Sequence, residues 1–137
     1  MRTNMETILE ALTPPDRTDV SYRHVDSQDS HEGLDRSFWF DVPTGGEPQA
    51  ERGNAMTEYQ HNVVIRLRLM AEGYTQRTLF NRVANEAVLF IRAIDKAAET
   101  SWGSGVLNVI TNGYTTDRVR DEVVVSMPIT AHVEETD

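Results

Sequence analysis

Alternating apolar and polar positions mark two segments of the chain as strands with one buried face. In residues 63–69 the apolar side chains alternate with Arg66 and Arg68, which predicts a strand with one face in a core. Residues 123–133 alternate over a longer run, with one apolar face made by Val123, Val125, Met127, Ile129, Ala131 and Val133. Pro128 interrupts this second strand and has no N–H to donate, so we expect the strand at a sheet edge or with a bulge.

Between these strands the hydrophobic period changes from two to that of a helix. From Thr78 onward, apolar residues recur at steps of three and four: Phe80, Val83, Ala84, Ala87, Phe90, Ile91, Ile94 and Ala98. The pattern predicts one amphipathic helix, roughly 30 Å long at about 1.5 Å per residue. A stripe of this length must cover a sheet, so the segment from residue 62 to 98 is expected to organise the fold.

The face opposite this stripe is expected to be exposed. It carries Arg82, Asn85, Glu86, Leu89, Arg92 and Lys96. A leucine ringed by polar side chains is typical of a subunit contact with an apolar centre and a polar rim. A single exposed leucine is also ordinary protein surface. We favour the contact, and predict subunit-interface residues at Arg82, Asn85, Leu89, Arg92 and Pro128.

The remaining pattern predicts an α+β fold. A short helix is expected over residues 3–12, and further strands over 19–25, 36–42 and 106–111, with Phe38, Phe40 and Val42 on a buried side. Residues 114–122 are expected to form a charged connection. The sequence thus indicates a single domain over residues 1–137, with a small mixed or antiparallel sheet packed on one long helix.

Two segments fall outside this pattern. Residues 43–57 have no period and many turn formers, so they predict a flexible loop or an extended hairpin. Either form would suit an arm that orders against a neighbouring molecule, and a surface insertion is the alternative. The acidic tail, residues 134–137, is expected to lie in solvent.

Composition narrows the classes of function. The net charge is −9, and residues 1–62 carry 5 arginines against 12 acidic residues. An acidic chain repels a phosphate backbone, which disfavours a sequence-reading nucleic-acid binder. There is no cysteine, so disulfides and thiolate metal sites are excluded. No stretch of 18 apolar residues and no typical signal peptide is found, so neither a membrane segment nor export by the common secretory route is expected.

The densest group of possible metal ligands lies between His24 and Glu32. Within these nine residues the sequence has two histidines, His24 and His31, and three carboxylates, Asp26, Asp29 and Glu32. Imidazole and carboxylate groups suit zinc or manganese. Their spacing matches no ligand frame, so we expect a solvated acidic loop. No nucleophile elbow or phosphate-binding loop is present. We therefore expect no enzyme activity, no cofactor and no metal.

The order and pattern of the segments resemble the tail terminator proteins of long-tailed bacteriophages and related tailed particles. The resemblance rests on the short N-terminal helix and on the strand VVIRLRL at 63–69. It also rests on a glycine-containing turn into RTLFNRVANEA at 77–87 and on the closing strand VVVSMPITAHV at 123–133. It spans nearly the whole chain and involves no diagnostic motif.

The resemblance implies a structural virion protein, present in the host cytoplasm during assembly and then in the tail or neck. Such a protein forms a homohexameric ring at the end of the tail tube, stops tube polymerisation and offers a surface for head or neck proteins. DNA would only pass through the lumen, whose acidic wall would let it slide. A head-closure or tail-completion neck protein is one alternative. A small ferredoxin-like ligand-binding regulatory domain is another, from a different class.

Overall fold

A computed structural model describes residues 2–28, 33–52, 56–98 and 106–136. Within these ranges the helices are α1 (Arg2–Glu10) and α2 (Gln76–Ala98). The strands are β1 (Arg23–His24), β2 (Ser37–Phe40), β3 (Thr44–Arg52), β4 (Met56–Met70), β5 (Val106–Thr111), β6 (Thr115–Val119) and β7 (Glu122–Thr136). The expected α+β fold class is confirmed, with a mixed sheet, one long helix and a short N-terminal helix.

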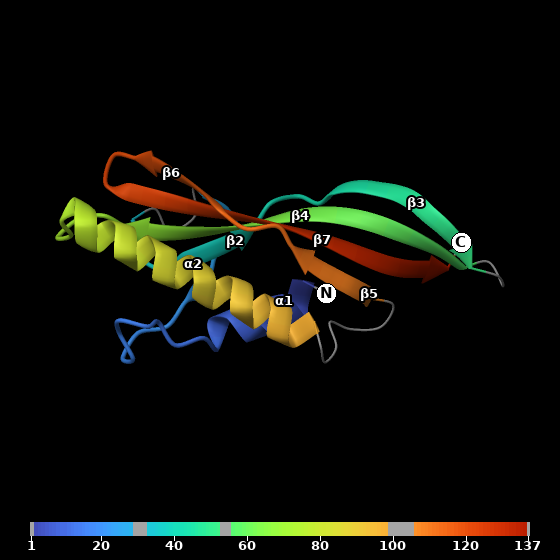
Figure 1. Cartoon of the computed structure of the whole chain (residues 1–137), viewed down its shortest axis with the longest axis horizontal. Helices are drawn as coiled ribbons and strands as arrows, with labels where there is room; N and C mark the ends of the chain where they lie inside the picture. The colour runs from blue at the N-terminus through green and yellow to red at the C-terminus, as the bar shows by residue number, and fades with distance from the viewer. Residues whose placement is uncertain (1, 29–32, 53–55, 99–105, 137) are drawn as a thin grey trace.

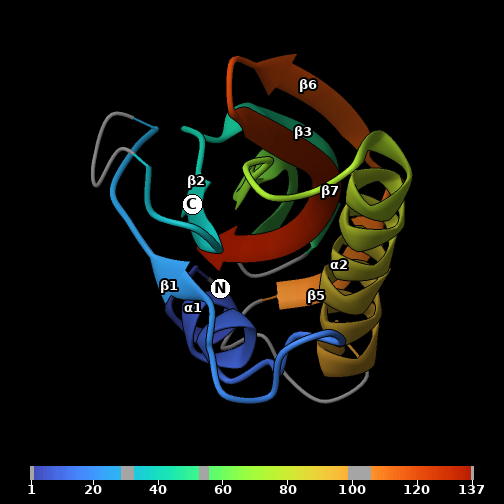
Figure 2. The same ribbon diagram turned by 90° about the vertical axis from the view of Figure 1, so that its left-hand side faces the viewer.

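The sheet is built around two long strands. β4 and β7 pair antiparallel from Met56 opposite Thr136 to Met70 opposite Glu122. The strand order is β1-β2-β4-β7-β5, with β3 also beside β4 and β6 also beside β7, and β1 is parallel to β2. Figure 1 shows α2 lying along one part of this pair, while the part that carries β3 projects beyond both helices as an arm. Figure 2 shows a strongly curved sheet with α2 and β6 on one flank and α1, β1 and β2 on the other.

The main core lies between α2 and one face of the sheet. The alternation predicted for the two long strands holds there, because Ile65, Leu67, Leu69, Val125, Met127 and Ile129 are all buried. Phe90 of α2 meets the rings of Tyr22 and Phe38 edge-on, with centroid distances of 4.5 and 5.8 Å. On the opposite face of the sheet, Val25, Trp39 and Val124 form a smaller cluster of buried side chains. The sheet is therefore covered on both faces near β2.

A tight turn joins β4 to α2. Gly73 has φ 84, a left-handed conformation that glycine adopts without strain. The helix then begins with a side-chain cap, since Thr75 Oγ1 accepts the backbone N–H of Thr78 at 3.2 Å. The turn and the cap together fix the direction in which α2 leaves the sheet.

Three parts of the sequence prediction need correction. Within residues 43–57, β3 pairs with the start of β4, as the hairpin alternative predicts and the loop does not; residues 53–55 lie outside the described residues. Register shifts occur along β3, between Gly45 and Glu47 and between Pro48 and Ala50, so its pairing with β4 is irregular. The predicted connection at 114–122 contains β6, whose residues are all exposed. The acidic tail is strand as far as Thr136 and pairs with β4.

The expectation that the strand containing Pro128 lies at a sheet edge is wrong. β7 is flanked by β4 on one side and by β5 and β6 on the other. Along β7, pairing with β5 ends at Ile129 and pairing with β6 begins at Ser126, so Pro128 lies between the two. Its carbonyl accepts a hydrogen bond from the N–H of Asn112 at 3.0 Å. In an extended strand the nitrogen and carbonyl of one residue point to the same side. The missing donor of Pro128 therefore faces the break between β5 and β6.

Candidate functional site

The predicted interface residues fall into two groups. Asn85 and Arg92 are exposed on α2, as expected. Leu89 is half-buried and packs against the main core, and Pro128 is half-buried in the middle of β7. Arg82 is only 5% exposed, which contradicts the prediction that it lies on an open helix face. The reason is a group of charged residues under the helix.

We call this group the buried charge cluster: Asp16, Tyr22, Asp35, Arg36, Arg82 and Glu86. Glu86 was also expected on the exposed face, but its side chain is fully buried. Arg36 Nε donates to Glu86 Oε1 at 2.9 Å, and the hydroxyl of Tyr22 donates to Glu86 Oε2. Charge-assisted hydrogen bonds of this kind compensate the burial of both ions. Residues far apart in sequence therefore decide which face of α2 turns inward.

Arg82 and Asp35 extend the cluster to the end of β4. Arg82 Nη2 donates to Asp35 Oδ2 at 2.6 Å, and Arg82 Nη1 donates to the carbonyl of Met70 at 2.7 Å. The N–H of Met70 in turn donates to Asp35 Oδ1 at 2.8 Å. Arg82 also lies over the ring of Tyr74, 4.7 Å from its centroid. These bonds hold α2, the last residue of β4 and the segment before β2 in one arrangement.

Glu86, Tyr22 and Arg36 of the cluster have shifted pKa values. Burial raises the pKa of Glu86, although the hydrogen bond from Tyr22 and the charge of Arg36 act in the opposite direction. Burial, followed by the hydrogen bond to Glu86, raises the pKa of Tyr22. Burial alone would lower the pKa of Arg36, but Glu86, Asp16 and Asp35 raise it. Each charge is matched within the chain, so the cluster acts as a structural clamp.

A third buried arginine lies on the opposite face of the sheet. The sequence predicts one buried face for this strand, formed by the residues that alternate with Arg68, but Arg68 is fully buried as well, with its guanidinium 5.2 Å from the centroid of Trp39. It donates to Ser37 Oγ at 3.2 Å and to the carbonyl of Gln28, and its Nε lies 3.4 Å from Glu122 Oε2. The alternation in β4 is correct here, and only the prediction of a single buried face fails.

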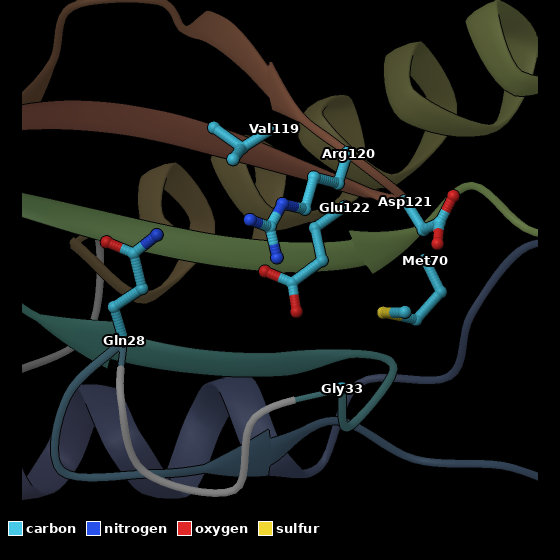
Figure 3. Close-up of a pocket in the computed structure, with 7 residues that line it drawn as sticks. All are labelled: Gln28, Gly33, Met70, Val119, Arg120, Asp121 and Glu122. Carbon is cyan, nitrogen blue, oxygen red and sulfur yellow. The ribbon is translucent and has the colours of Figure 1, made fainter.

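An open pocket of about 450 Å³ lies beside Glu122, at the end of the molecule opposite the arm. Figure 3 shows Gln28, Arg120 and Glu122 directed into it, while the carboxylate of Asp121 points away. Ligand sites in proteins are mainly apolar with a few converging polar groups. Among the described residues that line this pocket, Met70 and Val119 are the apolar contributors. This lining does not favour a small-molecule site.

Two apolar surfaces are open to solvent. The first, which we call the helix patch, lies between α2 and β6. Its base is formed by the buried side chains of Leu79, Val83 and Val123, and its exposed apolar side chains are Phe80 and Tyr114, beside Ala84. Phe80 is 73% exposed, although the sequence pattern placed it in the buried stripe. The rotation of α2 that buries Arg82 and Glu86 turns Phe80 outward.

The second surface, which we call the strand-end pocket, lies where β2 ends beside α1. Its lining includes Met5, Phe40, Val42, Pro43 and Val63, with Arg2, Asp26 and Asp41 at the polar positions, and its volume is about 250 Å³. Val42 is 85% exposed, which corrects the prediction that it faces the core. Neither surface could be seen in the sequence, because Phe80 and Val42 each fall at a position where the hydrophobic period of their segment predicts a buried side chain.

The possible metal ligands do not converge in the part that the structure describes. His24 lies 5.5 Å, between ring centroids, from both Phe38 and Phe40, and its Nε2 is 3.5 Å from Glu6 Oε1. Asp29, His31 and Glu32 lie outside the described residues. Among the described residues, no group of three metal-binding side chains comes together.

Comparison with known proteins gives no assignment. No protein family model and no curated protein matches the sequence. Neither described helix is long and apolar enough to cross a bilayer. The function must therefore be argued from the arrangement of surfaces.

Proposed function

We propose that this protein is a structural ring subunit that ends the tail tube of a tailed bacteriophage or related particle. In this role copies of the chain associate head-to-tail, halt polymerisation of the tube protein and present a surface for head or neck proteins. The lumen of the ring lets DNA pass without reading its sequence. The resemblance of the sequence to tail terminator proteins supports the proposal, and so do the helix patch and the strand-end pocket.

The observation that carries the proposal is the placement of two different exposed apolar surfaces on opposite flanks. The helix patch belongs to the flank of α2 and β6, and the strand-end pocket to the flank of α1, β1 and β2 (Figure 2). A two-fold dimer joins one surface to itself, whereas a ring joins two unlike surfaces. Exposed apolar patches are typical of protein interaction sites. This layout favours head-to-tail association.

The projecting arm adds a second argument. β3 and the first residues of β4 extend beyond the helices, together with the end of β7 (Figure 1). A strand with an unpaired edge offers backbone groups to another chain. A sheet that extends past its own core is therefore suited to contact a neighbouring subunit or the tube.

Loss of the protein provides the test of this function. When its gene is inactivated in the particle that encodes it, we expect tubes that grow beyond their normal length and heads that remain unattached, because nothing ends polymerisation. Electron microscopy of the resulting tails measures the tube lengths. Supplying the wild-type chain is the control and should restore uniform tubes. Tubes of normal length without the protein, but with heads unattached, would instead support a head-closure or tail-completion role.

A further inference from the structure

The helix patch presents an exposed aromatic side chain, and the strand-end pocket is a hollow with an apolar lining. Phe80 stands out from α2, and the strand-end pocket of about 250 Å³ has room for one phenyl ring. We propose that Phe80 of one copy inserts into the strand-end pocket of the next copy, beside Phe40 and Val42. This proposal rests on the head-to-tail ring proposed above and names the contact that would close it.

The charges around the two surfaces favour this pairing. Arg118 lines the helix patch, and Arg77 lies one helical turn before Phe80 on the exposed start of α2. The charged residues of the strand-end pocket are Arg2, Asp26 and Asp41. Arg2 is paired with Glu6 at 2.9 Å and Asp41 with Arg66 at 2.7 Å, whereas the exposed Asp26 has no ion pair with another described residue. Opposite charges at the rim steer two surfaces together.

Self-pairing of either surface is disfavoured. Two helix patches would bring the arginines Arg77 and Arg118 of one copy close to those of the other, and two strand-end pockets would leave the exposed Phe80 of both copies in solvent. Like charges facing each other suppress the wrong pairing. The preferred occupant of the pocket is therefore the helix patch of a second copy, and repeated docking continues from copy to copy.

Disulfide trapping tests this contact directly, because the chain has no native cysteine. Gln76→Cys, one helical turn from Phe80 in the helix patch, and Val42→Cys both change exposed side chains, so both variants keep the Phe80 ring and the core intact. Under mild oxidation we expect a mixture of the two single variants to give covalent dimers, and the double variant to give a ladder of larger species. Each single variant alone should stay monomeric on a non-reducing gel. The matched control is Asn85→Cys mixed with Val42→Cys, which should not cross-link.

A second variant makes the test independent of disulfide geometry. Phe80→Asp should weaken self-association about tenfold or more, because a large buried ring is lost and a charge is added. Circular dichroism checks that the variant is folded. If the wild-type protein assembles but neither the cross-link nor the effect of Phe80→Asp is seen, the docking proposal fails and the ring remains. Cross-linking of either single variant with itself also overturns the proposal. Absence of any association, alone or with tubes, defeats the ring as well.

Discussion

Replacing Arg36 by methionine is expected to lower the free energy of unfolding by about 3–5 kcal/mol. Arg36 is 3% exposed and its partner Glu86 is fully buried, so the substitution leaves a carboxylate in the core without its cation. Breaking a buried ion pair from one side has an effect of this size. Urea denaturation followed by circular dichroism measures the change. Methionine is a long unbranched side chain like arginine. Residue 36 has a left-handed backbone conformation, φ 58, which strains both residues alike, so the substitution does not change the backbone strain.

Two further variants separate burial from charge. Arg66→Met removes an ion pair with Asp41 in which both side chains are about one-third exposed, and it should cost no more than about 1 kcal/mol. Adding Glu86→Gln to Arg36→Met removes the uncompensated charge, so the double variant should be more stable than Arg36→Met alone. If the two single arginine variants lose equal stability, the claim that the cluster is an effective clamp is wrong.

The Arg36→Met variant should also show a distinct pH dependence. Burial already raises the pKa of Glu86, and loss of the Arg36 charge raises it further in the folded state. The folded variant then binds a proton that the unfolded chain, with an ordinary glutamate, does not bind until lower pH. Its free energy of unfolding therefore increases as the pH falls from neutrality toward the pKa of an ordinary glutamate, and the gap to the wild type narrows. Arg82, Asp16 and Asp35 also face this site, so Glu86→Gln in the same background is the control. A constant gap contradicts the prediction.

Replacing Phe90 by alanine should have the largest effect among the core positions. Phe90 is fully buried between α2 and the sheet and contacts the rings of Tyr22 and Phe38. Deletion of a buried phenyl ring leaves a cavity and costs about 3–5 kcal/mol. A domain of this size has a total stability of roughly 5–15 kcal/mol, so the loss is a large fraction. Chemical denaturation at fixed pH measures it.

Phe80→Ala is the matched control on the same helix. Its ring is mostly in solvent, so its removal should change the stability of the separated chain by about 0.5 kcal/mol or less. Equal losses for the two phenylalanines would show that α2 is not oriented as described. A large loss for Phe90 alone supports both the core and the outward placement of Phe80.

The elements with strong periodicity could be predicted from the sequence. The strand at 106–111 has the predicted bounds, and β4, β7 and α2 contain the predicted segments. Alternation in β4 and β7 is reliable because a shift of one residue would turn the whole apolar face outward. The local sequence alone carries this information.

The orientation of α2 could not be predicted in the same way. A helical pattern assigns charged side chains to solvent, and it therefore placed Arg82 and Glu86 outside and Phe80 inside. Their partners are Asp35, Arg36 and Tyr22, which precede the helix by tens of residues. No period within the helix contains that information. The open apolar surface at Phe80 was hidden by the same effect.

The arm was predicted only as one of two alternatives for a related reason. Strand β3 contains two glycines and a proline and has two shifts in register, so its sequence lacks the alternation of an ordinary strand. β6 was missed because all of its residues are exposed and none marks a buried face. In both cases pairing with a long neighbouring strand, β4 or β7, overrides weak local preference.

The mass and shape of the assembled protein test the account most directly. Light scattering coupled to size-exclusion chromatography, with negative-stain imaging of the same fractions, should be carried out on the 15.5-kDa chain alone and with tail tubes. The account predicts closed rings of about six copies, free or seated on tube ends. A monomer under both conditions, or a dimer with two-fold symmetry, contradicts it.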